Sequence, residues 1–248
     1  MNRTLKRILI GLAIVIFFLS LVIGGLYLKM RSEMKKMNVI ETKEVVHNIY
    51  AIKDSFVNMF VVKDSDRYVA IDAGDDLNAI AVELKRLNVS PVKVTAVLLT
   101  HTDGDHVAAI KLFKKATVYL SKDEEQMING KTSRMMSSHN KIDTKVYTLL
   151  DDQQVIRIGN VRIKAIMTPG HTPGSMSYLV NDKYLFVGDA FSLKAGKIDK
   201  PNKLFTGDMK TAIQSFKKIT NLPGAEFIFT GHTGYTNDYK KAIKTELK

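Results

Sequence analysis

The sequence contains no cysteine. A disulfide framework, thiolate metal ligands and a cysteine nucleophile are therefore excluded. Lipoprotein processing is excluded as well, because it requires a cysteine. The absence suits a protein exposed to oxidising surroundings, although many bacterial proteins simply use little cysteine.

Glycine and proline are not enriched, with 15 and 5 of the 248 residues, and no internal repeat or low-complexity tract is present. No GxSxG motif is found, so a serine nucleophile of that kind is not expected. Apolar residues make up 45% and charged residues 25%, which is typical of a globular protein. The length allows one good-sized domain plus an appendage.

The chain also lacks a concentrated basic patch in its main part. The formal net charge is +12, but seven of the Lys and Arg residues and only one Glu lie in residues 1–37. Those basic side chains are expected to contact anionic lipid headgroups. Further along, acidic residues are interspersed with basic ones, whereas nucleic-acid-binding proteins more often gather their charge in a patch with aromatic residues. We therefore expect no nucleic-acid partner.

Residues 8–28 form one long uncharged run, ILIGLAIVIFFLSLVIGGLYL. As a helix this run would be about 31 Å long, which matches the roughly 30 Å hydrocarbon core of a bilayer. A cleavable signal peptide is the alternative, but the run exceeds a usual signal core and no A-x-A-like site follows it. We expect residues 1–37 to be a retained membrane anchor with basic flanks, and residues 38–248 to form one domain.

The orientation of the anchor depends on the basic residues around it. Three precede the run and four follow it, so the positive-inside count is nearly balanced. The short basic N-terminus resembles the start of an ordinary signal anchor. We expect a single-pass protein of the cell membrane with an extracytoplasmic domain.

After the anchor, β-rich runs and helical patterns follow one another. Short runs with turn signals fill residues 45–76. A helix is expected at residues 77–87, a buried strand at 94–99, and a helix at 106–114 with Asp105 near its N-cap. A short helix and an exposed loop fill residues 121–141, and more strands continue to residue 187. Helices at 209–219 and 235–247 flank the strand EFIFT. Two batches of strands, each followed by helices, predict two sheets with helices packed outside.

Four β-rich runs end in tight turns that carry metal-competent side chains. VTAVLL precedes the loop THTDGDH, VRIKAIM leads through TPG to a histidine, YLFV leads to an aspartate, and EFIFT leads to another histidine. The side chains are His101, Asp103, Asp105, His106, His171, Asp189 and His232. If these strands lie side by side, the side chains gather at one rim, and adjacent glycines let the backbone turn sharply.

Each turn alone has a simpler interpretation, such as an exposed histidine or a helix cap. The loop HTDGDH is the stronger signal, because it holds four ligand-type groups within six residues. Four of the six histidines of the chain lie at these turns. Coincidence is therefore a poor explanation, and a shared metal site is the better one.

With these motifs the sequence resembles the metallo-β-lactamase-fold hydrolases over nearly everything after the anchor. HTDGDH matches three of the four ligand positions of HxHxDH, and PGHTPGS looks like the glyoxalase II-like branch. VNMFVV followed by VAIDAG resembles the two opening strands of that fold. The resemblance implies an α/β protein, an αββα sandwich, with a one- or two-metal site between the ends of its sheets.

The resemblance also implies a role for each residue. One metal would be held by His101, Asp103 and His171, and a second by Asp105, His106 and His232, with Asp189 bridging the two. Asp72 matches a position that supports the metal loop by hydrogen bonding. His47, on an early strand, is expected to be structural, and His139 in the polar loop is an alternative ligand.

Asp103 stands where the family has a histidine. A carboxylate oxygen binds zinc at about 2.0–2.2 Å, but the side chain is shorter than imidazole, so the metal must shift or accept an intervening water. The added negative charge weakens the Lewis acid, and oxygen ligation makes manganese or iron more plausible beside zinc. An empty first site and a mononuclear enzyme are the alternative to the two-metal site that we expect.

The expected chemistry is hydrolysis. A metal-bound hydroxide would attack a small carbonyl ester, thioester or lactone, and Asp105 would orient it and protonate the leaving group. Little chain follows His232, so the C-terminal substrate domain of true glyoxalase II is expected to be missing. The alternatives are a mononuclear iron enzyme that oxygenates a sulfur substrate, and a non-catalytic sensor or binding module with a decayed metal site.

Overall fold

The computed structural model describes residues 2–133 and 139–244, and it divides the chain into two compact units, Met1–Met37 and Asn38–Lys248. In the first unit, α1 (Arg3–Met34) begins where the Asn2 side chain accepts a hydrogen bond from Thr4 N. By length and composition α1 is able to cross a membrane, with a mean hydropathy of 2.9 over its most apolar 18 residues. A signal sequence near an N-terminus has the same properties.

The second unit begins with a seven-stranded sheet. Its strands lie in chain order, β1-β2-β3-β4-β5-β6-β7. The first four are antiparallel, and β4 to β7 are parallel. Their bounds are β1 (Lys43–Val46), β2 (Ile49–Asp54), β3 (Val57–Asp64), β4 (Arg67–Ile71), β5 (Val94–Leu98), β6 (Thr117–Ser121) and β7 (Tyr147–Leu150).

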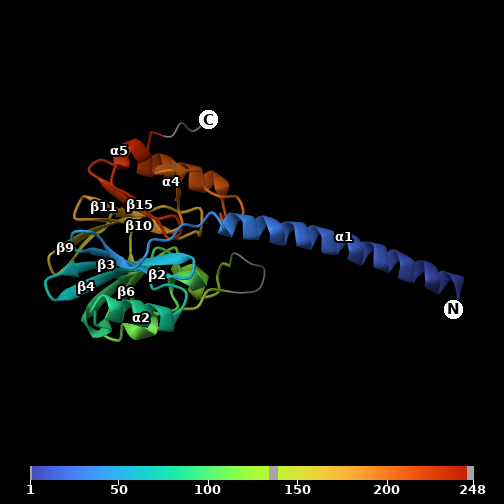
Figure 1. Ribbon diagram of the computed structural model, residues 1–248, viewed down its shortest axis with the longest axis horizontal. Helices are drawn as coiled ribbons and strands as arrows, with labels where there is room; N and C mark the ends of the chain where they lie inside the picture. Colours follow the sequence, from blue (N-terminus) through green and yellow to red (C-terminus); the bar gives the residue numbers. More distant parts are fainter. Residues whose placement is uncertain (1, 134–138, 245–248) are drawn as a thin grey trace. The chain divides into compact units, whose positions relative to one another are not determined.

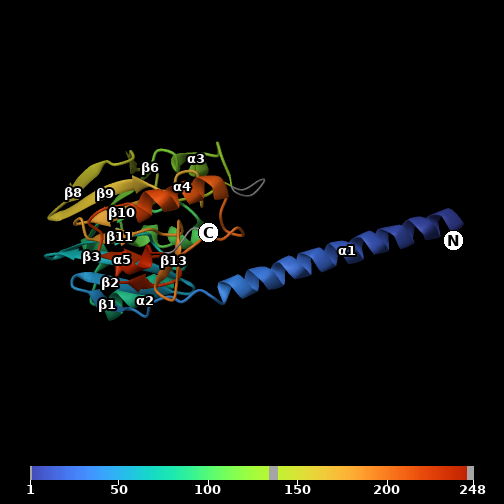
Figure 2. The same ribbon diagram turned by 90° about the horizontal axis from the view of Figure 1, so that it is seen from above.

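A second sheet has six strands in the order β15-β14-β11-β10-β9-β8, of which β8 to β11 can be followed in Figure 2. Only β11 and β14 are parallel neighbours. The bounds are β8 (Val155–Ile158), β9 (Val161–Met167), β10 (Met176–Val180), β11 (Tyr184–Phe186), β14 (Phe227–Phe229) and β15 (Tyr235–Thr236). A separate hairpin consists of β12 (Ser192–Lys194) and β13 (Lys197–Asp199).

The helices lie on the outer faces of the two sheets. They are α2 (Leu77–Arg86), α3 (Glu125–Ile128), α4 (Met209–Thr220) and α5 (Tyr239–Ala242), with 3₁₀ turns at Pro91–Lys93, Gly104–His106 and Ile110–Leu112. Asp76 caps α2 and Asp208 caps α4, each by accepting hydrogen bonds from the first-turn amides. One face of each of these two helices is apolar and buried, which fixes its docking on a sheet.

Three apolar cores fill the spaces between the layers. Phe60 and Leu98 from the first sheet meet Tyr178 and Phe229 from the second sheet in the central core. A second core joins the first sheet to α2, and a third joins the second sheet to α4 and α5. Figure 1 shows α2 on the opposite side of the sheets from α4 and α5. The expected αββα architecture is therefore confirmed.

Two expected helices are wrong. Residues 106–114 form two 3₁₀ turns, because Ala108 N and Ala109 N donate to Gly74 O and Ala73 O instead of closing helical turns. The segment that begins at Tyr235 first pairs as β15 with β14, and α5 covers only Tyr239–Ala242. The end of that expected helix, residues 245–247, lies outside the described residues. The expected helices at 77–87 and 209–219 are confirmed as α2 and α4.

Candidate metal centre

The second sheet brings three of the candidate side chains to one edge. Phe186 at the end of β11 pairs with Phe229 at the end of parallel β14. Asp189 and His232 each lie three residues beyond these partners, so they emerge side by side. Strand β9 points the same way as β11, because β10 is antiparallel to both. The turn after β9, which carries His171, therefore opens at the same edge.

The first sheet supplies the remaining candidates from the ends of β4 and β5. These strands are parallel, with Ile71 paired to Leu98, so Asp72 lies beside the start of the THTDGDH loop. The loop is linked to the second sheet by a hydrogen bond from Met176 N to Thr100 O of 2.8 Å. The two sheets therefore hold their ligand-bearing loops against each other.

Two glycines are required by the close packing of these loops. Gly188 has a φ of 51°, and a Cβ there would lie 2.3 Å from Thr100 Oγ1. A Cβ on Gly231 would lie 2.5 Å from Asp189 Oδ1 and 3.0 Å from a ring carbon of His106. Real side chains do not tolerate such distances, so glycine beside the ligand-type residues serves close approach as well as turning.

The seven candidate side chains form three overlapping groups, in each of which the possible ligand atoms lie within 4.8 Å of one another. The groups are His101–Asp103–His171, His101–His106–Asp189 and Asp105–His106–His232. Shared members make them one continuous cluster between the two sheets. The structure thus brings together the seven side chains that follow the four strand-end turns.

On one side of the cluster, Asp103 faces two histidines. Its Oδ2 lies 3.2 Å from His171 Nε2 and 3.6 Å from His101 Nε2. Oδ2 of Asp189 lies 3.6 Å from the same His171 nitrogen. Two imidazole nitrogens and two carboxylate oxygens therefore surround this side.

On the other side, Asp105 Oδ2 lies 3.6 Å from His106 Nε2 and 3.4 Å from His232 Nε2. Asp189 reaches both of these histidines, with Oδ1 3.4 Å from His106 Nε2 and Oδ2 3.0 Å from His232 Nε2. Asp189 is thus the residue in contact with both sides of the cluster.

Oxygen partners at Nδ1 orient three of the rings. His106 Nδ1 lies 2.9 Å from Asp72 Oδ2, and His232 Nδ1 lies 2.7 Å from Phe56 O. His101 Nδ1 lies 3.1 Å from Thr100 Oγ1. The Asp72 carboxylate and the Phe56 carbonyl can only accept, so Nδ1 of His106 and of His232 donates to them. Nε2 is then the ring atom that faces the cluster, as in metal-binding histidines.

Asp72 holds the loop together as the sequence suggested. It has a φ of 61°, a left-handed conformation that is costly for a residue with a side chain. Its carboxylate accepts hydrogen bonds from Thr100 N and Thr100 Oγ1 in addition to His106. The strained backbone therefore serves to aim one buried carboxylate at the metal loop.

Burial and neighbouring charges shift the pKa values of the cluster in opposite directions. Burial lowers the pKa of His101 well below its usual value. For His106 burial acts in the same direction, but the carboxylates of Asp189 and Asp105 outweigh it and raise the pKa well above its usual value. Burial works to raise the pKa of Asp189, yet His232 and His106 hold it well below the usual range. The carboxylates thus place negative charge directly beside the histidines, where a cation would be favoured.

The residues present fit a metal. His101 Nε2, His106 Nε2 and Asp189 Oδ1 are buried and have no hydrogen-bond partner. Buried polar atoms without partners are rare in native proteins. All three belong to one of the ligand groups, and imidazole with carboxylate is a donor set suited to zinc, manganese or iron. A divalent ion bound within the cluster would supply the missing partner of all three.

Sequence reasoning missed a polar framework behind the cluster. Glu124 is buried, accepts hydrogen bonds from Thr102 N and Thr102 Oγ1, and accepts another from Thr172 Oγ1. It therefore links the THTDGDH loop to the turn that holds His171. Burial raises the pKa of Glu124 although these donors act against the rise. No motif marks this residue, which lies in the polar stretch SKDEEQ.

The two other histidines lie elsewhere in the described part of the chain. His47 is exposed in the turn after β1 and not on a strand as expected. The His139 ring lies near Gly130, and neither histidine belongs to a ligand group among residues 2–133 and 139–244. The neighbour of His139, Asn140, instead donates a hydrogen bond to Asp103.

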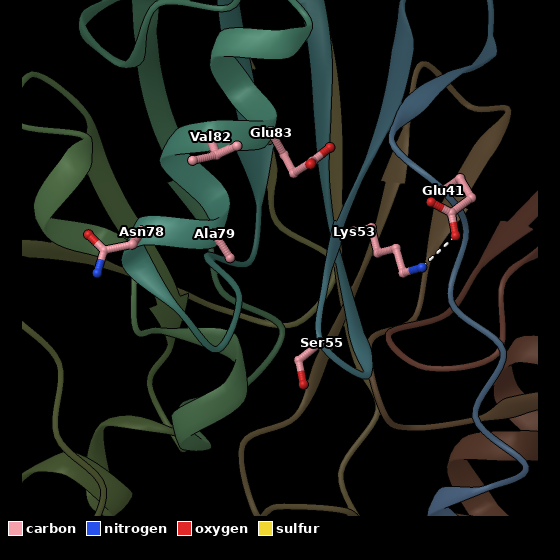
Figure 3. Close-up of a pocket in the computed structure, with 7 residues that line it drawn as sticks. All are labelled: Glu41, Lys53, Ser55, Asn78, Ala79, Val82 and Glu83. Carbon is pink, nitrogen blue, oxygen red and sulfur yellow. Dashed lines mark hydrogen bonds and ion pairs between the residues drawn. The ribbon is translucent and has the colours of Figure 1, made fainter.

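Figure 3 shows a surface groove of about 450 Å³ between α2 and the β2–β3 hairpin. Its lining residues are Glu41, Lys53, Ser55, Asn78, Ala79, Val82 and Glu83, and Lys53 forms an ion pair with Glu41. None of the seven ligand-type residues lines this groove. The groove is thus separate from the candidate metal centre.

Known proteins are similar to this chain in sequence and in fold. A probable polyketide biosynthesis zinc-dependent hydrolase, PksB of Bacillus subtilis (strain 168), is 30% identical over 179 residues, which cover 69% of this chain and 72% of that protein. A hydroxyacylglutathione hydrolase of Bartonella tribocorum is 32% identical over 182 residues, or 73% of this chain. The match spans only 63% of that hydrolase's length.

The crystal structure of BLEG-1 B3 metallo-beta-lactamase superposes with a TM-score of 0.59 at 28% identity, covering 76% of this chain and 93% of that one. The family model of the metallo-beta-lactamase superfamily matches residues 52–232, which include all seven ligand-type residues and Asp72. With the four-layer fold and the His/Asp cluster, this match establishes that the chain belongs to the metallo-beta-lactamase superfamily and is related to its metallohydrolases.

Proposed function

We propose that this protein is a membrane-anchored metallohydrolase that cleaves a small carbonyl ester, thioester or lactone. The observation that carries the proposal is the convergence of four histidines and three aspartates from the ends of two sheets. The relatives named as zinc-dependent hydrolase and hydroxyacylglutathione hydrolase support hydrolysis as the reaction class.

In this proposal the ligand groups would serve two divalent ions. His101, Asp103 and His171 would hold one ion, and Asp105, His106 and His232 would hold the other. Asp189 contacts histidines of both sets and would be available to either ion. Zinc is the favoured metal, because a named relative is zinc-dependent and imidazole suits zinc. The extra carboxylate at Asp103 also makes the first position suitable for manganese or iron.

A divalent ion in this position lowers the pKa of water and polarises a carbonyl oxygen. Asp105 is the residue of this chain placed to handle protons, because its Oδ2 faces His106 and His232 while its side chain is 21% exposed. Its carboxylate accepts the proton of the attacking water and later donates it to the departing oxygen or sulfur. The hydroxyl of water joins the acyl carbon as the C–O or C–S bond breaks, so atoms and charges balance.

Full-length protein in detergent micelles, assayed against a panel of esters, thioesters and lactones, tests this proposal. We expect turnover that a chelator removes and that added zinc or manganese restores. His171→Ala abolishes it, whereas His47→Ala, which removes an exposed histidine from the β1–β2 turn, leaves it unchanged.

Two results contradict the proposal. Metal-loaded protein that turns over no member of the panel but binds a partner identifies a sensor or binding module. Oxygen consumption by iron-loaded protein on a sulfur substrate identifies an oxygenase.

We also propose that α1 is retained as a single membrane span, with the enzyme domain outside the cytoplasm. The length and apolar character of α1 support a span. The protein is expected to stay in the membrane fraction after an alkaline wash, with an intact mass that includes residues 1–37. A mature protein without these residues identifies α1 as a cleaved signal, and protection of the domain from external protease places it in the cytoplasm.

A further inference from the structure

The two oxygens of the Asp103 carboxylate have different neighbours. Oδ2 faces the cluster, 3.2 Å from His171 Nε2 and 3.6 Å from His101 Nε2. Oδ1 accepts a hydrogen bond of 3.0 Å from Asn140 Nδ2. One oxygen is therefore directed toward the position of a metal, and the other is occupied by an amide donor.

The orientation of the Asn140 amide is determined by its neighbours. Its Nδ2 also lies 3.0 Å from Thr102 Oγ1. The single hydroxyl proton of Thr102 is directed to Glu124 Oε1 at 2.7 Å, so the threonine oxygen is left as an acceptor. Asn140 must then present its NH₂ group, and the two N–H bonds serve Thr102 and Asp103. Asn140 thus donates to Thr102, and Thr102 in turn donates to buried Glu124.

The backbone of Asn140 has an attachment of its own. Its backbone N donates a 2.9 Å hydrogen bond to the carbonyl of Met127, a fully buried residue of α3. The side chain itself is half-buried, beside the THTDGDH loop. Substitutions that change only the amide group therefore leave this backbone attachment in place.

We propose that Asn140 is a positioning residue that makes Asp103 a one-oxygen metal ligand. Imidazole, which the family has at this position, offers one donor nitrogen to a metal, whereas a free carboxylate offers two oxygens. By occupying Oδ1, Asn140 leaves Oδ2 as the metal-facing atom and so preserves the one-donor geometry. This inference rests on the proposed function, because it concerns the same metal site.

The test is a double-mutant cycle in full-length protein, with Zn²⁺ and Co²⁺ as probes. Asn140→Ala and Asn140→Leu remove both N–H donors, and the leucine keeps the branching at Cγ, although its methyl groups are larger than the amide atoms. Loss of such an orienting contact is expected to lower affinity for the weaker-bound ion by about 10–100-fold. The Co²⁺ protein should also lose visible absorption intensity, because a two-oxygen carboxylate raises the coordination number.

The decisive comparison is the Asp103→His background, in which imidazole has no second oxygen for Asn140 to occupy. There the same Asn140 substitutions are expected to change neither metal affinity nor the Co²⁺ spectrum. Asn129→Ala is the matched control, since the side chain of this exposed asparagine accepts a hydrogen bond from Lys131 N. If Asn140→Ala lowers the melting temperature of metal-free protein, the two backgrounds are compared with Asn140→Leu instead.

The outcomes separate this inference from the proposed function. Wild-type protein that binds neither ion overturns both. Wild-type binding that the Asn140 substitutions do not alter overturns the role of Asn140 and leaves the metal site standing. An equal loss in the Asp103→His background shows a merely structural role for Asn140 and overturns the inference as well.

Discussion

Asp103 departs from the family pattern in its donor atom but not in its place. Its Oδ2 lies 3.6 Å from His101 Nε2 and 3.2 Å from His171 Nε2, so it faces the same two imidazoles. The change adds one negative charge to a pocket that already contains Asp105 and Asp189. At the scale of single residues, the proposal is that Asp103 alters the metal site without removing it, and that the hydrogen bond from Asn140 is part of this change.

Asp72 provides a direct test of how the ligands are oriented. Asp72→Ala leaves Thr100 N and His106 Nδ1 without acceptors in a buried place. The free energy of unfolding should fall by about 1–3 kcal/mol for each buried group left unpaired. Metal affinity should fall by about 10–100-fold, because the His106 ring loses its orienting contact. Urea unfolding of metal-free protein and competition with a chromophoric chelator measure the two effects.

The control for this substitution is Asp66→Ala, at a position where the carboxylate is 75% exposed and lies 3.9 Å from Lys93 Nζ. Little change in either measurement is expected there. If Asp72→Ala behaves like Asp66→Ala, the support assigned to Asp72 is wrong.

At the scale of elements, the candidate ligands lie at the ends of strands, and the turn after β14 packs closely against two of them. Gly231→Ala places a methyl group 2.5 Å from Asp189 Oδ1 and must displace this carboxylate. We expect metal binding to be lost while the fold is retained. Gly104→Ala, in the metal loop itself, meets no atom within 4 Å and should bind metal normally. Equal metal content in the two variants, by elemental analysis, contradicts the account.

Asp152, in the turn between β7 and β8, contacts both α4 and the end of β9, and these contacts predict that stability depends on pH. Burial works to raise the pKa of Asp152, but hydrogen bonds from Lys218 Nζ and Met167 N outweigh it and lower the pKa below its usual value. A lowered pKa in the folded state stabilises the protein above the unfolded value of about 3.9. This contribution is lost as the pH falls through the lowered pKa.

Asp152→Asn should therefore lower the free energy of unfolding at neutral pH by less than about 1 kcal/mol, because both partners are partly exposed. The difference from wild type should close as the pH falls below 4. Chemical unfolding of metal-free protein across this range measures it. A difference that stays constant with pH means that the side chain acts through packing and not through charge.

The whole molecule was predictable where local patterns and the global fold agree. Alternating β-rich runs and two amphipathic helices sufficed to predict two sheets with helices packed outside, because burying one face of each element leaves few arrangements. The order αββα came from the resemblance to the metallo-β-lactamase fold. The gathering of the candidate ligands was predictable from strand order, since His171, Asp189 and His232 all come after strands that end at one edge. Gly188 and Gly231 beside two of these residues strengthened that expectation.

Other features depended on contacts that no local pattern contains. Val107, Ile110 and Phe113 have helical spacing, yet the backbone around them bonds to the loop after β4 and forms 3₁₀ turns. Asn140 reaches Asp103 across 37 residues of sequence. Neither hydrophobic periodicity nor a sequence motif predicts these contacts, because both form only when distant segments pack together.

The most direct test of the central claim is the metal content of the wild-type protein at equilibrium. Full-length protein in detergent, dialysed against micromolar zinc and analysed by elemental mass spectrometry, should retain one to two ions per chain. Substituting alanine for both His106 and His171, one from each side of the cluster, should remove them. Wild-type protein that retains no ion, or a double variant that retains as much as wild type, contradicts the proposed metal centre.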